Sequence, residues 1–175
     1  MNQLNETQLM ASSSLSPTNE QSTACYDGIS GLYVNITNSK IVDRESAYVI
    51  IKYKEHYLFL KNTHTDKIWL IGGAIENSET PLEALTREIE EEIGYAVNSK
   101  ELQFLTVHTN FYYHQPDNYA FKAIKHIYLL NVTELFNIDF HDQDFYPPKW
   151  YSLESIKTEN TVQVDFILEL ISKRD

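Results

Sequence analysis

Six glutamates and one arginine lie within the fourteen residues from Glu79 to Glu92. On a helix, Glu88, Glu91 and Glu92 share one arc of roughly 100°. Like charges one turn apart repel by a few tenths of a kcal/mol each, and the single Arg87 cannot neutralise them. Mg²⁺ takes oxygen ligands, commonly carboxylates together with phosphate oxygens of a substrate. The spacing therefore indicates a divalent metal site that handles phosphates.

Local signals predict the helix that carries these acids. Thr80 is a suitable N-cap, Pro81 suits the first helical position, and Glu83 closes a capping box with Thr80. Gly94 ends the helix. Apolar residues occupy an arc of roughly 80° next to the acids and predict a buried face. These residues are Leu82, Leu85, Ile89 and Ile93.

A solvated acidic helix face is the alternative interpretation, and it is the usual one for a glutamate-rich helix. Such a helix has no need of Gly72 and Gly73 directly upstream, nor of a further acid at Glu79. The metal interpretation is favoured because it accounts for both features.

The whole stretch resembles the signature of the Nudix hydrolases, including MutT-like enzymes. Every position at which that signature fixes one residue type is occupied accordingly, by Gly73, Glu79, Arg87, Glu88, Glu91, Glu92 and Gly94. Two flanking positions depart from it: Ile71 stands where the family usually has proline, and Tyr95 where a bulky aliphatic is usual. The first departure removes a rigid turn residue ahead of Gly73.

The resemblance implies hydrolysis of a nucleoside diphosphate linked to a further group, by water activated by Mg²⁺ or Mn²⁺. It implies that Glu88, Glu91 and Glu92 bind the metal through their side chains and Gly73 through its carbonyl. The general base would be Glu88 or Glu91, or else a distant acid on a later loop, for which Asp144 is the candidate. Arg87 would pair with Glu79 and orient a metal-binding carboxylate; a purely structural ion pair is the alternative.

Three candidates for substrate contacts lie outside the signature. Tyr112 and Tyr113 follow it by less than twenty residues, where related hydrolases of dinucleoside polyphosphates carry a tyrosine. Aromatic faces stack on bases, although core or rim packing is the more usual role of such residues. Asp144 lies in a loop where related enzymes place a distant acid; the alternative is a solvated loop residue.

The substrate expected from the resemblance is a small nucleotide, such as a nucleoside triphosphate. A dinucleoside polyphosphate is the alternative. A second alternative is a Nudix-fold module that binds a nucleotide without cleaving it. Such modules usually lack one or more acids of the signature, and this chain retains them all, which favours the enzyme.

Hydrophobic periodicity predicts an α+β or α/β layered domain, which the resemblance specifies as a mixed β-sheet between helices, an α/β/α sandwich. Apolar runs at 47–51 and 57–60 predict a hairpin. Other strands are expected at 32–36, 69–71, 102–107, 111–113 and 123–130, with an edge segment at 145–151. Helical spacing predicts a terminal helix over 162–172.

Composition limits the remaining possibilities. The 175 residues suit a single domain, expected over 26–175, after a polar tail over 1–25. The net charge of −11 disfavours nucleic-acid polymers and anionic membranes as partners. The chain shows no secretory signal, no apolar run of membrane-spanning length and one cysteine, so we expect a cytoplasmic protein. A homodimer is compatible with the sequence.

Overall fold

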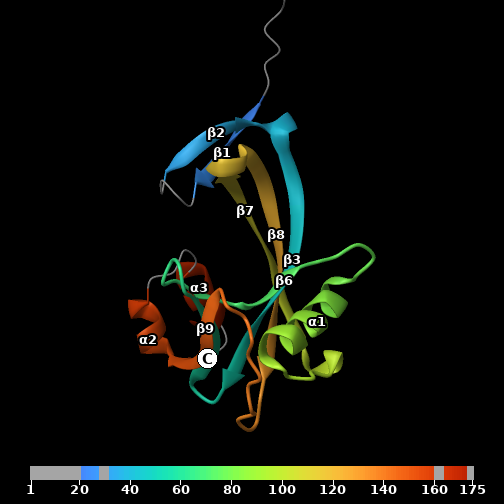
Figure 1. Cartoon of the computed structure of the whole chain (residues 1–175), viewed down its shortest axis with the longest axis vertical. Coiled ribbons are helices and arrows are strands. Elements are labelled where there is room, and N and C mark those ends of the chain that lie inside the picture. The colour runs from blue at the N-terminus through green and yellow to red at the C-terminus, as the bar shows by residue number, and fades with distance from the viewer. Residues whose placement is uncertain (1–20, 28–31, 160–163, 173–175) are drawn as a thin grey trace, which may run out of the picture.

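A mixed β-sheet between helices forms the core of the computed structural model, which describes residues 21–27, 32–159 and 164–172 (Figure 1). The strands are β1 (Ser22–Asp27), β2 (Tyr33–Thr37), β3 (Ile41–Tyr53), β4 (His56–Asn62), β5 (Ile68–Trp69), β6 (Ile71–Ala74), β7 (Gln103–His114), β8 (Tyr119–Asn131) and β9 (Phe145–Ser152). The helices are α1 (Pro81–Ile93), α2 (Leu153–Thr158) and α3 (Val164–Ser172).

The long strand β3 organises the sheet. The strands follow the order β2-β1-β7-β8-β3-β4-β5, while β6 also pairs with β3 and β9 with β4. On one edge β3 pairs in parallel with β8 from Ile41 to Lys52. On the other edge it pairs with β6 over Ser46–Val49 and with β4 beyond that point. The predicted mixed sheet is thereby confirmed.

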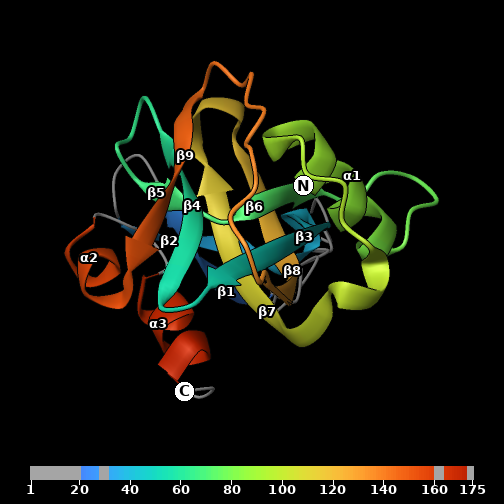
Figure 2. The same ribbon diagram turned by 90° about the horizontal axis from the view of Figure 1, so that it is seen from below.

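The two faces of the sheet carry separate apolar clusters, because successive side chains of a strand point to opposite faces. On β3, Val49 and Ile51 pack with Leu85 and Ile89 of α1. The neighbouring Ile50 packs in the other cluster, with residues of α2 and α3. Figure 2 shows α1 on one side of β3 and β4, with α2 and α3 on the other. The sheet is therefore covered on both faces.

The predicted helix α1 begins and ends as expected. Thr80 is the N-cap: its hydroxyl accepts a hydrogen bond from the Glu83 backbone N–H, and the Glu83 carboxylate accepts one from the Thr80 N–H. Pro81 is the first helical residue, and Gly94 ends the helix in the left-handed region at φ 64°. Of the predicted apolar face, Leu85, Ile89 and Ile93 are buried, whereas Leu82 is only partly buried.

Most of the other predicted elements are present. The hairpin at 47–51 and 57–60 is the pair β3 and β4, and the edge segment at 145–151 is β9. The segments expected at 102–107 and 111–113 are one continuous strand, β7, because β8 pairs along its whole length. The short helix α2 was not predicted; it begins where the Ser152 hydroxyl caps the Ser155 N–H. Residues 162–163 of the expected terminal helix lie outside the described residues.

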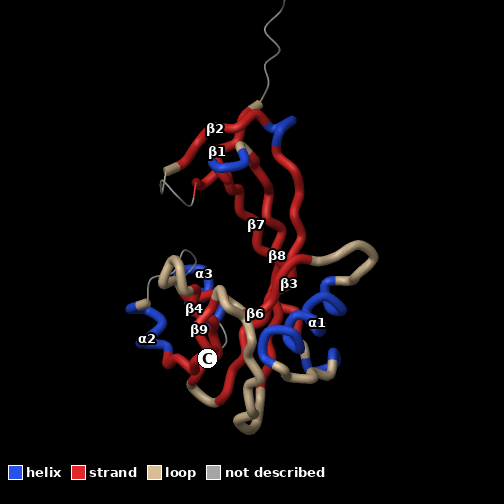
Figure 3. The backbone as a smooth tube through the Cα atoms, viewed as in Figure 1, coloured by secondary structure: helices blue, strands red, loops and turns tan. Residues whose placement is uncertain are grey.

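An antiparallel hairpin of β1 and β2 extends the sheet at its N-terminal end. Figure 3 shows it at the ends of β3, β7 and β8 that are remote from α1, α2 and α3. Strand β2 is the edge strand of the sheet, close to the strand expected at 32–36. Strand β1 includes residues 22–25 of the segment expected to be a tail; residues 1–20 lie outside the described residues.

Among the described residues, no helix has both the length and the apolar character that crossing a membrane requires.

The capping box gives a test of local stability. Thr80→Ala removes the hydroxyl that accepts from Glu83, and we expect it to lower the free energy of unfolding by about 1 kcal/mol. Thr80→Ser retains an acceptor oxygen and should unfold nearly like the wild type. Urea denaturation of the three proteins measures the difference; equal midpoints for Thr80→Ala and the wild type would show that the cap does not contribute.

Candidate functional site

A close contact between β6 and β3 sets the position of the candidate site. Gly72 pairs with Tyr48 of β3, and Gly73 pairs with Ala47. Gly72 has a φ of +125°, and a Cβ atom there would collide with the backbone of Ala47 and Tyr48. Only glycine fits at this position, which explains one half of the Gly72-Gly73 pair.

The second glycine makes room for an acid. A Cβ atom built on Gly73 would lie 2.6 to 2.8 Å from the carboxylate atoms of Glu88. The Glu88 carboxylate therefore rests against the backbone of β6, in space that any other residue at 73 would fill. This contact joins two parts of the signature that are fifteen residues apart.

Arg87 holds four groups of the site together. Its Nε and Nη2 atoms donate to the two carboxylate oxygens of Glu79 at 2.8 and 3.0 Å, and Nη2 also donates to the Ala74 carbonyl at 3.1 Å. Its Nη1 atom donates to Glu88 at 2.9 Å and to Glu91 at 3.1 Å. One guanidinium nitrogen thus lies between two carboxylates, where a cation is needed to offset their repulsion.

Glu92, the third acid of the helix face, points to strand β6. Glu92 accepts a hydrogen bond of 2.7 Å from the Gly72 backbone N–H. Burial raises the pKa of Glu92 to about 8, and the charges of Glu88 and Asp142 also raise it. Burial likewise raises the pKa of Glu88, whereas the hydrogen bond from Arg87 lowers the pKa of Glu79 to about 2. The cluster is short of positive charge.

The donor set fits a hard divalent cation. In the described part of the chain no three His, Cys, Asp or Glu side chains converge in the manner of a bound metal site. Arg87 engages Glu88 and Glu91, while Glu92 turns to the Gly72 N–H. All available donors are nevertheless oxygens on one helix face beside a glycine backbone, which is the chemistry that Mg²⁺ and Mn²⁺ prefer.

A cavity of about 240 Å³ lies on the sheet and reaches Ala74, the residue after Gly73. It is lined by Arg44, Glu45, Ser46, Tyr48, Trp69, Ala74, Tyr112, Phe121, Ala123 and Lys125. Tyr48 links it to the acids: burial is the main cause that raises the pKa of its hydroxyl, and the charges of Glu92 and Glu88 contribute further. Tyr48 thus lies in the wall of the cavity and within the field of the acids.

The two tyrosine candidates separate onto opposite faces of β7. Tyr112 lines the cavity, and its hydroxyl accepts a hydrogen bond of 3.2 Å from the Nζ atom of Lys125. Tyr113 points away, and its hydroxyl donates to Asn118 at 3.1 Å. Tyr112 therefore faces the cavity and Tyr113 does not, and a substrate contact of either stays a prediction.

Asp144 lies apart from the other candidates. Its carbonyl accepts from Thr63, its carboxylate is 3.4 Å from His64, and its side chain is exposed. Among the described residues it forms no hydrogen bond or ion pair with the acids of α1. Asp142 of the same loop is the acid whose charge reaches Glu92. The role predicted for Asp144 stays a prediction.

Sequence reasoning also missed Lys125, which is only 7% exposed. Its position was readable from the alternation in β8: Lys125 shares its side of the strand with Ala123 and Ile127, both of which are buried. A charged residue on the buried face of a strand is unusual and often functional.

Comparisons with known proteins agree with the geometry. The family model for the NUDIX domain matches residues 42–170. The MutT protein of Methanosarcina mazei Go1 superposes with a TM-score of 0.63 at 18% identity, covering 78% of this chain and 98% of that one. A MutT NUDIX hydrolase of Burkholderia pseudomallei gives 0.57 at 20% identity, covering 74% and 98%.

An Ap4A hydrolase of C. elegans, solved as a binary complex, gives a TM-score of 0.53 at 20% identity, covering 74% of this chain and 96% of that one. No curated protein sequence matches the chain significantly.

Buried Lys125 predicts a pH dependence of stability. Burial lowers its pKa from 10.5 to about 8 in the folded protein, so the unfolded chain binds this proton more tightly. Stability therefore rises with pH between about 8 and 10.5. Lys125→Met removes the cost, which is at most about 3 kcal/mol. We expect the variant to be more stable than the wild type at pH 7, by a margin that shrinks above pH 8.

Thermal unfolding followed across this pH range measures the margin, with Lys149→Met as the control because Lys149 is exposed on β9. A constant margin at all pH values would show that the buried ammonium is not its cause.

Proposed function

The chain belongs to the Nudix hydrolase family, and we propose that it hydrolyses the pyrophosphate bond of a small nucleoside diphosphate-X substrate with Mg²⁺. One observation supports this most directly. The Glu88 carboxylate rests against the Gly73 backbone, beside Glu91 and Glu92 on the same helix face. These are the residues that the family signature uses to bind metal, and Ala74, which follows Gly73, lines a cavity of about 240 Å³.

The residues that would hold the metal are Glu88, Glu91 and Glu92 through carboxylate oxygens and Gly73 through its carbonyl. Mn²⁺ has the same preference for oxygen and would also bind. When bound, the ion neutralises phosphate oxygens and makes water a better nucleophile. Glu88 or Glu91 accepts the proton that the attacking water releases.

Arg87 is suited to hold the loop before α1 in place while the acids bind a metal, because its two edges make separate contacts. The edge formed by Nε and Nη2 binds Glu79 and the Ala74 carbonyl, and only Nη1 contacts Glu88 and Glu91. A cation that displaces Nη1 leaves the other edge in place. Arg87 would then keep the loop before α1 fixed while the acids turn to the metal.

A nucleoside triphosphate is the substrate we propose first, as for MutT-like enzymes. A dinucleoside polyphosphate is the second candidate, favoured by the position of Tyr112 in the cavity and by the likeness to the C. elegans Ap4A hydrolase. The NUDIX domain of Shewanella oneidensis NrtR, also similar in fold, was solved with ADP-ribose. Small nucleotides are thus the expected ligands, whereas the net charge of −11 disfavours nucleic-acid polymers.

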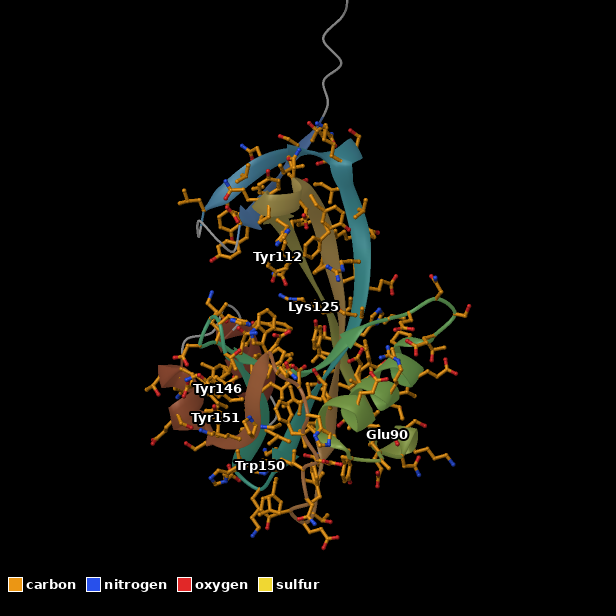
Figure 4. The ribbon with its side chains drawn as sticks, viewed as in Figure 1. Glu90, Tyr112, Lys125, Tyr146, Trp150 and Tyr151 are labelled. Carbon is orange, nitrogen blue, oxygen red and sulfur yellow. The ribbon has the colours of Figure 1, made fainter. Side chains whose placement is uncertain are left out.

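Substitution of the acids tests the proposal. Glu91→Gln and Glu92→Gln should each reduce turnover on the order of 100-fold or more, because each removes a metal-binding oxygen. The fold should persist, since each change relieves repulsion within the cluster. Glu90→Gln is the matched control. Glu90 is exposed on the same helix (Figure 4), and this variant should keep the turnover of the wild type.

The measurement is release of phosphate or pyrophosphate with Mg²⁺ from nucleoside triphosphates, diadenosine polyphosphates, ADP-ribose and nucleotide sugars, with circular dichroism to check folding. Activity of both variants equal to that of the wild type would refute the assigned metal site. Nucleotide binding without any product would instead favour the non-catalytic module.

The two glycines give an independent test through metal binding. Gly73→Ala should leave stability nearly unchanged, because the atoms nearest to its Cβ belong to the movable end of the Glu88 side chain. It should nevertheless weaken Mn²⁺ binding about tenfold or more by displacing that carboxylate. Gly72→Ala should destabilise the fold, because its Cβ meets the backbone of β3. Calorimetric titration with Mn²⁺ and thermal unfolding separate the two effects; unchanged Mn²⁺ affinity in Gly73→Ala would contradict the proposal.

A further inference from the structure

A row of aromatic rings crosses the far half of the sheet. It begins on the N-terminal hairpin with Tyr33 and Tyr26, whose ring centroids are 5.5 Å apart. It continues through Tyr112 at 6.5 Å from Tyr26, Phe121 at 5.5 Å from Tyr112, and Tyr119 at 5.6 Å from Phe121. Strands β2, β1, β7 and β8 contribute to this aromatic row in turn.

Two cations lie over the aromatic row. The guanidinium of Arg44 is 5.3 Å from the centre of the Phe121 ring, and the Nζ atom of Lys125 is 5.1 Å from the centre of Tyr112. Cations and aromatic rings together are typical of surfaces that bind nucleotides, because rings stack on bases and cations attract phosphates.

Lys125 is a positive charge without an acidic partner. It is 7% exposed, and among the described residues no carboxylate forms an ion pair with it. Its hydrogen-bond partner is the neutral hydroxyl of Tyr112. Burying an unpaired charge is costly, so proteins seldom retain one without a use. An anionic group of a ligand would supply the missing charge.

The cavity lies between the end of β6 and the aromatic row. One end is lined by Ala74, which directly follows Gly73, and the other by Phe121 and Arg44, with Lys125 and Tyr112 also in its wall. Figure 4 shows Tyr112 and Lys125 on the opposite side of the sheet from α1, which carries Glu90. Lys125 and the rings of Tyr112 and Phe121 thus share one cavity, where a phosphate and a base of the same ligand can meet them.

The outer part of the row belongs to a segment that the family model leaves out. The match covers residues 42–170, whereas Tyr26 and Tyr33 lie on β1 and β2. Tyr33 is 72% exposed, so its ring is available to a ligand and contributes little to a buried core. The hairpin thus adds accessible aromatic surface to the substrate side of the domain.

We infer that the hairpin of β1 and β2 completes a nucleobase subsite, in which a base stacks on the aromatic row and Lys125 binds a phosphate oxygen of the same nucleotide. This inference rests on the proposed function for the identity of the substrate. It predicts that the protein prefers nucleotides to polyphosphates without a base, because the base of a nucleotide can stack on the aromatic row while the acid cluster engages the phosphates.

Equilibrium binding without metal tests the subsite separately from catalysis. The probes are the four common nucleoside monophosphates, with ribose 5-phosphate as the base-free control, in calorimetric titrations. We expect at least one monophosphate to bind about tenfold or more tightly than ribose 5-phosphate, and Tyr33→Ala and Tyr112→Ala to reduce that preference severalfold.

Lys125→Met should weaken the binding of nucleoside monophosphates and ribose 5-phosphate alike, about tenfold, because both carry the phosphate. Tyr146→Ala and Lys149→Met are the matched controls: both residues are exposed on β9, outside the cavity, and should leave affinity unchanged. A merely structural lysine would alter stability and not phosphate affinity.

Comparison of a nucleoside triphosphate with inorganic tripolyphosphate as substrates then separates this inference from the proposed function. If substrates are hydrolysed, but no monophosphate binds more tightly than ribose 5-phosphate and the tyrosine variants bind like the wild type, the subsite is refuted. The proposed hydrolase function then stands. If the monophosphates bind as expected but no substrate is cleaved, the hydrolase fails and the subsite stands.

Discussion

Repulsion among carboxylates held close to a backbone is the constraint on which the site depends. Glu88, Glu91 and Glu92 lie on one helix face, and burial raises the pKa of Glu88 and Glu92 because it disfavours their charged forms. Such a cluster needs a positive charge among its oxygens. In this structure Arg87 supplies part of it. The close pairing of Gly72 and Gly73 with β3 and the capped start of α1 hold the acids at that position.

The sheet converts this local cluster into a site with two sides. Strand β3 pairs with β6 on one edge and with β8 on the other, so residues distant in sequence meet around it. Tyr48 of β3 is close enough to the acids to feel their charge and also lines the cavity on the face opposite α1. The acids and the cavity are therefore coupled through one strand.

Lys125 is a buried charge that the fold retains at a cost in stability. Its burial lowers its pKa to about 8, which is the signature of a charge removed from water without a compensating acid. Natural proteins tolerate such costs mainly where a ligand benefits from them. The aromatic row beside it, part of which comes from a hairpin outside the family-matched segment, supplies the apolar surface that such a ligand would need.

The sequence by itself determined what depends on neighbours along the chain: the cap at Thr80, the end at Gly94, the apolar face of α1 and the acids beside it, together with the family. Only the tertiary structure decided which of Tyr112 and Tyr113 faces the cavity, that the charge of Asp142 acts on Glu92, and that Lys125 lies over a ring of the aromatic row. The physical reason is strand register. Helix faces follow from local periodicity, whereas the neighbours of a strand residue are set by pairing between segments far apart in the sequence.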